Sequence, residues 1–109
     1  MAAHELKDIL GRLAALGDIS ARAMFGAHGL YWRGVIFAIA HRERLYFKVN
    51  DQSRATFEAR GMGPFRPNDR QTLKSYYEVP PEVLDDTEAL HSWAGEAIRA
   101  AQESHGPVA

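Results

Sequence analysis

The sequence contains no cysteine. Disulfide bridges, thiolate nucleophiles and cysteine-ligated metal sites are therefore excluded. Long apolar runs are also missing, since the longest, from Val35 to Ala40, is far too short to span a bilayer. The first residues lack the basic and apolar regions of a secretory signal peptide. Together these absences predict a cytoplasmic protein without membrane contact.

Basic charge is not in excess either. The chain carries 13 Lys and Arg residues against 14 Asp and Glu residues, which gives a net charge of −1. A protein that neutralises many phosphates usually has a basic excess or a basic stripe. The balance therefore disfavours strong autonomous DNA binding, although arginines near turns leave a local basic patch open.

The apolar pattern predicts one domain over residues 1–109. The segment 4–16 has apolar residues at spacings of three and four, which is typical of an amphipathic helix, and Gly17 stands where a C-capping glycine is expected. From residue 19 the period changes to two. Strands are predicted at 19–25, 30–32, 35–41, 45–49 and 72–79.

Two further helices complete the predicted fold. Helix propensity favours a short helix at 52–60, although an apolar period of two leaves a strand open there. Asp85 and Glu88, at capping-box spacing, open a last helix that runs to about residue 102. Two glycines and two prolines predict irregular structure at 61–70. The order indicates an α+β fold: an antiparallel sheet of about five strands with N-terminal, middle and C-terminal helices packed on it.

No pattern in the chain predicts catalysis, a cofactor or a metal site. No serine lies in a Gly-x-Ser-x-Gly elbow. The segment 61–63 begins like a dinucleotide fingerprint, but Arg66 stands where its last glycine is needed. His28 and His41 could approach each other across strands. The histidines nevertheless include no pair at metal-ligand spacing; they are His4, His28, His41, His91 and His105.

Several short stretches occur together in the register of a known family. They are Ala23-Met24-Phe25-Gly26, Gly29-Leu30-Tyr31, Phe37-Ala38-Ile39, Leu45-Tyr46-Phe47-Lys48, Phe57, Gly61, Pro64-Phe65, Tyr76-Tyr77-Glu78-Val79-Pro80, Leu90, Trp93-Ala94, Ala97 and Ala101. In these stretches, from about residue 5 to about residue 102, the chain resembles the TfoX/Sxy N-terminal domain. That family comprises regulators of bacterial competence, the uptake of DNA.

The resemblance implies a two-layer fold similar to secretion-chaperone-like domains. It also implies a non-enzymatic co-regulator that acts beside a cyclic-AMP-responsive transcription activator, with no catalytic residues and no cofactor. Full-length members of the family carry a second, mostly helical domain after this one. The family-motif residues are expected to be mainly structural; they are Met24, Phe25, Gly26, Gly29, Lys48, Gly61, Pro64 and Phe65.

The leading hypothesis is a regulatory or adaptor domain that acts through protein–protein contacts. An exposed sheet face bearing Trp32 and Tyr76 would favour self-association, for example as a homodimer. The candidate partner-binding residues are Arg22, Trp32, Lys48, Arg66 and Tyr76.

Two alternatives to this hypothesis stay open. The first is a weak nucleic-acid-binding module, because aromatic residues interleaved with basic ones can stack on bases and contact phosphates. Its basic residues would be Arg22, Lys48, Lys74 and Arg66. The second is a small-ligand-binding domain with a pocket near Gly61 to Arg70.

Overall fold

The computed structural model describes residues 6–24 and 26–105. Two residues named above, His4 and Phe25, lie outside these ranges. The elements in chain order are α1 (Leu6–Leu13), the 3₁₀ helix η1 (Ala14–Leu16), β1 (Ile19–Met24), β2 (Ala27–Trp32), β3 (Val35–His41), β4 (Arg44–Lys48), α2 (Asp51–Ala59), β5 (Pro64–Asn68), β6 (Gln71–Glu78), α3 (Pro81–Leu84) and α4 (Thr87–His105). Within the described ranges no helix is long and apolar enough to cross a membrane.

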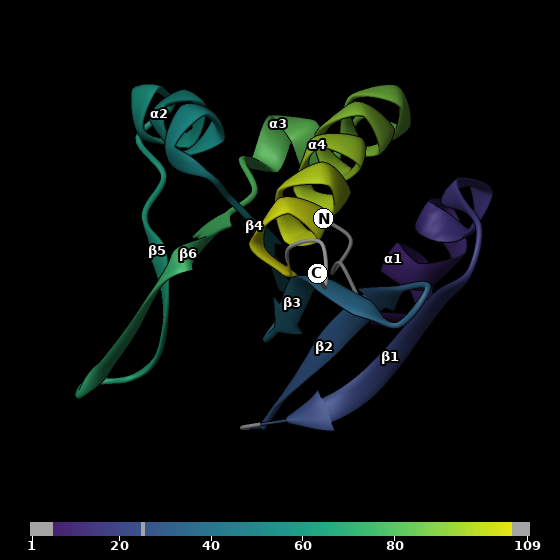
Figure 1. Ribbon diagram of the computed structural model, residues 1–109, viewed down its shortest axis with the longest axis horizontal. Coiled ribbons are helices and arrows are strands. Elements are labelled where there is room, and N and C mark those ends of the chain that lie inside the picture. The colour runs from purple at the N-terminus through teal and green to yellow at the C-terminus, as the bar shows by residue number, and fades with distance from the viewer. Residues whose placement is uncertain (1–5, 25, 106–109) are drawn as a thin grey trace.

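The sheet has six antiparallel strands in the order β1-β2-β3-β4-β6-β5. The predicted α+β class and antiparallel sheet are therefore confirmed. The first four strands follow one another as a meander, and β6 returns after α2 and β5 to pair with β4 (Figure 1). As a result β1 and β5 form the two edges.

The prediction of irregular structure at 61–70 is wrong, because Pro64–Asn68 forms strand β5. Proline cannot donate to a ladder, so it is confined to edge strands and bulges. Strand β5 meets both conditions: it lies at the sheet edge, and its register with β6 shifts twice. The prolines therefore mark an edge strand here.

The meander is built with tight turns. The turn at 33–34 lies between the strands predicted at 30–32 and 35–41, and both of its residues have positive φ, 49° and 84°, as a two-residue hairpin turn requires. The turn at 42–43 has the same geometry, with φ of 52° and 67°, although neither residue is glycine. The predicted strand break at 26–29 is shorter than expected, because β2 already begins at Ala27 and contains Gly29.

The helices end and begin at identifiable caps. Asn50 and Ser53 form a reciprocal capping box at the start of α2, which settles this segment as the predicted helix rather than a strand. The carboxylate of Asp86 accepts from the backbone N–H of Ala89 near the start of α4. This side-chain contact is one residue later in the chain than the predicted Asp85 cap.

All the helices pack on one face of the sheet. Helix α4 crosses β3 and β4, while α3 and α1 pack against α4 (Figure 1). The main core lies between these layers, and its fully buried side chains are large and apolar. They include Ile9, Leu13, Leu30, Phe37, Leu45, Phe47, Val79 and Leu90.

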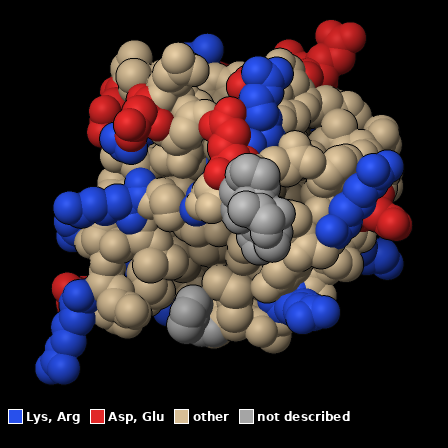
Figure 2. All heavy atoms as spheres, in the orientation of Figure 1, with Lys and Arg blue, Asp and Glu red and all other residues tan. Residues whose placement is uncertain are grey.

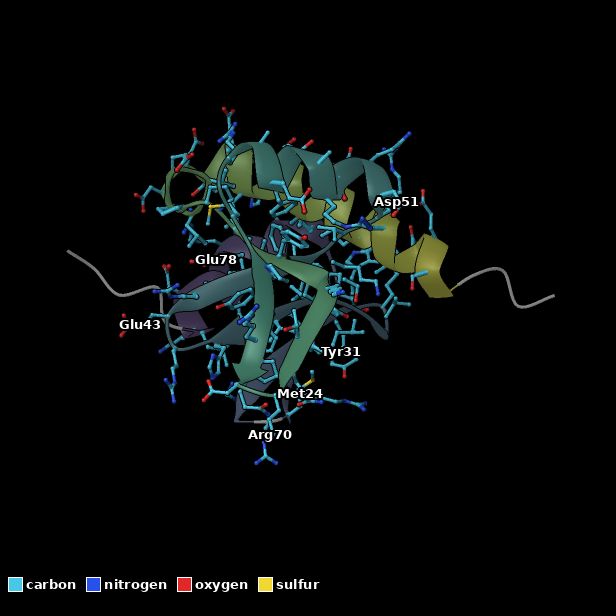
Figure 3. The ribbon with its side chains drawn as sticks, turned by 90° about the vertical axis from the view of Figure 1, so that its left-hand side faces the viewer. Met24, Tyr31, Glu43, Asp51, Arg70 and Glu78 are labelled. Atoms are coloured by element: carbon cyan, nitrogen blue, oxygen red, sulfur yellow. The ribbon has the colours of Figure 1, made fainter. Side chains whose placement is uncertain are left out.

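The opposite face of the sheet holds a second, smaller cluster made only of strand residues. Along β4, Leu45 and Phe47 point into the main core, whereas Tyr46 points into this second cluster, as strand alternation requires. Figure 3 shows the helices to one side, with Met24 and Tyr31 on the strands away from them. The buried members are Ala27, Ile39, Tyr46, Phe65 and Tyr76, with Met24 and Leu73 packed against them.

Candidate functional site

The face of the sheet opposite the helices, called here the helix-free face, carries most of the residues that the sequence singled out. Along β1, Ile19 and Ala21 pack on the main core, so Arg22 and Met24 point to the helix-free face. Lys48 reaches the same face at the end of β4. The structure therefore brings Arg22 and Lys48 onto one surface.

Each of these cations lies over a tyrosine ring. The guanidinium carbon of Arg22 is 5.4 Å from the centroid of Tyr31, and Nζ of Lys48 is 5.1 Å from that of Tyr76. Lys48 and Tyr76 are direct register partners of β4 and β6. Such contacts are favourable by about 0.5–1 kcal/mol at exposed sites. They hold both cations against the sheet instead of leaving them extended in water.

The two tyrosines also interact, which joins the pairs into one row. Burial, and to a lesser degree the nearby Tyr31 phenol, raise the pKa of Tyr76 to about 12. Figure 1 shows the β1–β2 and the β5–β6 ends of the sheet both extending away from the helices, so the helix-free face between them is concave. The row Arg22–Tyr31–Tyr76–Lys48 thus crosses the hollow of the sheet, and we call it the cation–tyrosine row.

Burial differs along the row. Tyr76 is only 8% exposed, so the expectation that it lies open on an exposed sheet face is wrong. Tyr31 and Lys48 are half-buried and Arg22 is exposed. Burial lowers the pKa of the Lys48 ammonium, because it disfavours the charged form. The groups that a partner could reach directly are therefore the two cations and the edge of Tyr31.

Gly29 lies at the centre of the β1–β2 part of this face. A Cβ at this position would stand 2.9 Å from both Sδ of Met24 and Cδ1 of Ile36, and 3.2 Å from Cε1 of Tyr31. The strands predicted at 19–25 and 30–32 leave Gly29 between them, but it is a residue of β2, and a Cβ here would require the side chains of Met24 and Ile36 to shift. The close packing fixes Tyr31 under Arg22.

An aromatic stack and an ion pair border the row. The rings of Tyr46 and Phe65 are 4.6 Å apart, and His41 meets Phe65 edge-on at 5.4 Å. Beside them, Nη1 of Arg44 contacts both carboxylate oxygens of Glu78 at 3.2 and 3.3 Å. Phe65, a predicted motif residue, is thus structural, since it ties β5 to the sheet.

Trp32 lies on the other face. Its indole N–H donates a 2.9 Å hydrogen bond to the carbonyl of Leu16, and its ring packs against the main core. The guanidinium of Arg33 lies 4.7 Å from the ring centroid. Trp32 is therefore half-buried, and the exposed aromatic face expected from the sequence is not formed by Trp32 and Tyr76.

The remaining predicted basic residues lie on the β5–β6 hairpin. Arg66 and Lys74 are exposed. The β5–β6 register shifts on both sides of Phe65, so strand alternation does not assign Arg66 or Lys74 to a face of the sheet. Of the four predicted basic residues, Arg22 and Lys48 are the two that lie over tyrosines of the row.

A groove between α2 and α4 is a feature that the sequence did not indicate. It has a volume of about 420 Å³, and Lys48 lies at its border. The rings of Phe57 and Trp93 meet edge-on within it at 4.9 Å, and Arg60 lies 5.2 Å over Trp93. Its cations already have partners, since Arg60 pairs with Glu82 at 3.1 Å. No sequence signal locates it, because α2 and α4 are 27 residues apart along the chain.

The pocket predicted near residues 61–70 is not formed as such. Most of this segment is strand β5, and the hollow at its end is lined by the turn residues 68–71 alone.

His28 and His41 do not approach each other across the strands. His28 pairs in register with Ala40 of the main core, whereas His41 stacks on Phe65 on the other face. Across the described chain, no group of three or more His, Cys, Asp or Glu residues could hold a metal ion.

The fold and the helix-free face define a two-layer α+β domain whose surface chemistry consists of cations held on tyrosines. The model of the TfoX N-terminal domain matches residues 11–101, which is most of the 109-residue chain. The chain belongs to the TfoX N-terminal domain family. This is a regulatory family that is not known for enzymatic activity, and it suggests a role related to competence. No curated protein matches the sequence.

Proposed function

We propose that this chain, one TfoX N-terminal-like domain over residues 1–109, is a non-enzymatic regulatory adaptor that acts in the bacterial cytoplasm. It works through protein–protein contacts as a transcriptional co-regulator, and its partner is a transcription activator. Membership in a regulatory family supports the regulatory role. Self-association through the sheet is part of the proposal.

One observation supports the protein–protein contact: the cation–tyrosine row on a concave face that no helix covers. Tyrosine and arginine are favoured anchors in protein interfaces because they combine apolar area with directed polar groups. Arg22 and Lys48 would meet carboxylates of the partner, and the ring of Tyr31 would supply apolar contact. Of the predicted partner-binding residues, Arg22 and Lys48 are therefore expected to contribute most to binding, and Trp32, Tyr76 and Arg66 to contribute less.

The nucleic-acid alternative has less support. Stacking on bases needs open ring faces, but cations cover Tyr31 and Tyr76. Contact with successive phosphates needs a continuous basic groove, whereas the row holds two cations, Arg22 and Lys48. Figure 2 likewise shows Lys and Arg side chains spread around the face in view, several beside acidic ones, rather than gathered in one stripe.

Affinity capture with a charge-matched control tests the proposal. The tagged wild-type chain is used as bait in extracts of the native bacterium, alongside the double variant Arg22→Ala/Lys48→Ala. The control is Lys7→Ala/Arg70→Ala, which removes the same charge from exposed positions on α1 and on the β5–β6 turn. The expected result is that a transcription activator is captured by the wild type and the control and is lost with the double variant.

Two outcomes contradict the proposal. One is that no transcription regulator is enriched by the wild-type bait. The other is that both double variants capture it equally, which would place the contact elsewhere. Binding of a DNA duplex that is retained by the control, lost with Arg22→Ala/Lys48→Ala and weakened by salt would favour the nucleic-acid alternative instead.

A further inference from the structure

The two edges of the sheet are built differently. Edge strand β5 carries Pro64 and Pro67, and its register with β6 shifts twice. Proline, bulges and short strands are the devices by which proteins prevent further strands from adding to an edge. The β5 edge is therefore closed to further pairing.

The β1 edge has none of these devices. Strand β1 contains no proline, and it pairs with β2 over six consecutive residues without a register shift. Its single charged residue is Arg22, which points to the helix-free face and not along the edge. Figure 1 shows β1 as the outermost strand on its side of the described chain.

The register shows which backbone groups of β1 are free. The carbonyl of Asp18 accepts from the N–H of Arg33, so Asp18 is turned toward β2. Hydrogen-bonding direction alternates along an antiparallel strand. The backbone N–H and C=O groups of residues 20, 22 and 24 therefore face β2 as well. Those of Ile19, Ala21 and Ala23 face outward from the sheet.

We propose that β1 pairs antiparallel with β1 of a second copy of this chain, with Ala21 opposite Ala21 of the second copy. This pairing joins two six-stranded sheets into one. It details the self-association included in the proposed function and is independent of the identity of any transcription activator.

Three constraints select this register. Residues directly opposite each other in a continuous sheet must lie on the same face, so odd-numbered residues of β1 pair with odd-numbered ones. Shifting the centre to Arg22 would place Arg22 opposite Arg22, and like charges directly opposite each other are destabilising. Shifting it to Ser20 would leave only two hydrogen-bonded pairs within β1, both of Ile19 with Ala21. With Ala21 at the centre, Arg22 lies opposite Ser20, and Ile19 covers the exposed side chain of Ala23.

The proposed register satisfies the free backbone groups. The pair Ala21–Ala21 and the two pairs Ile19–Ala23 are all of the hydrogen-bonded type. Each such pair exchanges two hydrogen bonds, which gives about six across the interface. The pairing thus removes the only unprotected sheet edge in the described chain.

The absence of cysteine makes the register directly measurable. Directly opposite residues of the hydrogen-bonded type have Cα atoms about 5.5 Å apart, which lies within disulfide range. Under mild oxidation, Ala21→Cys is expected to form a disulfide-linked dimer. A mixture of the single variants Ile19→Cys and Ala23→Cys should give a mixed dimer. Arg22→Cys alone should cross-link much less, because Arg22 lies opposite Ser20 in this register.

Oligomeric state in solution provides the second measurement. Light scattering coupled to gel filtration should show a dimer for the wild type at high micromolar concentration. Ala23→Lys adds a charge opposite Ile19 at an exposed position, and it should raise the dimer dissociation constant at least about tenfold. Ala21→Pro removes an outward N–H that no strand of its own sheet uses, so it should give a monomer with an unchanged circular dichroism spectrum.

Several results would overturn this proposal. A wild-type chain that is monomeric at every concentration would overturn the proposed dimer. In that case the partner of the β1 edge would be a strand of another protein. A dimer that persists in both Ala23→Lys and Ala21→Pro would place the interface elsewhere. Efficient cross-linking of Arg22→Cys without that of Ala21→Cys would show a different register. None of these results bears on whether a transcription activator is captured.

Discussion

The indole N–H of Trp32, at the end of β2, donates a hydrogen bond to the carbonyl of Leu16, the last residue of η1 before β1. This contact closes the end of the β1–β2 hairpin that lies farthest from its turn. Next to it, Gly17 has φ of 113°, and a Cβ there would lie 3.5 Å from Nε1 of Trp32. The sequence analysis named Trp32 as a candidate partner-binding residue, and in the structure it contacts the carbonyl of Leu16 and the main core.

Replacing Trp32 by phenylalanine should therefore destabilise the domain. The change removes one hydrogen bond and some apolar volume, which together cost about 1–2 kcal/mol. Chemical denaturation followed by circular dichroism measures this loss. Arg33→Ala is the control, because it removes only an exposed cation from the same ring and should cost much less. A Trp32→Phe variant as stable as the wild type would show that the bond contributes nothing.

Gly29→Ala should destabilise the domain by about 1 kcal/mol, the lower end of the usual cost of overpacking, because the closest atoms lie near the ends of flexible side chains. The backbone at Gly29 does not require positive φ, so the cost comes only from the contacts with Met24, Ile36 and Tyr31. Gly63→Ala is the matched control, because a Cβ there meets nothing within 4 Å and its φ is not positive. Thermal unfolding of both variants compares them. Equal midpoints would refute the packing argument.

Glu43→Gly should stabilise the domain, because residue 43 has φ of 67° in a two-residue turn. A left-handed conformation costs a residue with a Cβ about 1 kcal/mol, and glycine avoids most of this cost. For a domain of this size the gain corresponds to a rise in melting temperature of a few degrees, roughly 4 °C or more. Glu43→Ala separates backbone strain from charge, since it removes the carboxylate but keeps the strain. If alanine stabilised as much as glycine, strain would not be the cause.

Tyr76 should make stability depend on alkaline pH. In the unfolded chain a tyrosine ionises near pH 10, whereas in the fold the pKa of Tyr76 is raised to about 12. The stabilisation that comes from keeping Tyr76 neutral is fully present below about pH 10 and is lost as the pH rises toward about 12. Urea denaturation at about pH 9 and about pH 11 should therefore show a smaller fall in unfolding free energy for Tyr76→Phe than for the wild type. Equal falls in the unfolding free energy of the two proteins would show that Tyr76 does not cause the pH dependence.

The sequence was sufficient for the parts of the fold that depend on local patterns. The helical spacing of Ile9 and Leu13, the alternation along 19–24 and the glycine of the turn at 33–34 all act within a few residues. These features predicted α1, β1 and the turn between β2 and β3 correctly. The α+β class followed from their order, because strands clustered between helices favour an antiparallel sheet.

The parts that failed depend on partners far along the chain. Whether a proline-containing segment is a strand depends on its place at an edge, and β5 reaches its edge position only through β6. The burial of Tyr76 depends on its cluster with Ile39 and Tyr46 and on Lys48 over its ring, all on strands that are distant in sequence. Gly29 resembled a turn glycine because the sequence does not show which side chains would collide with a Cβ. The sequence therefore identified Arg22 and Lys48 as candidate site residues, but it did not predict the geometry of the site.

The order of the strands also has a consequence for synthesis of the chain. Strands β1 to β4 pair with their sequence neighbours, so the meander closes only short loops and can form early. Its inner face, with Leu30, Phe37 and Phe47, is covered only when α4 packs on it, and α4 is made after all six strands. A nascent chain that has not yet reached residue 87 therefore shows a formed sheet with an uncovered apolar side, which is the state most exposed to aggregation and to capture by chaperones.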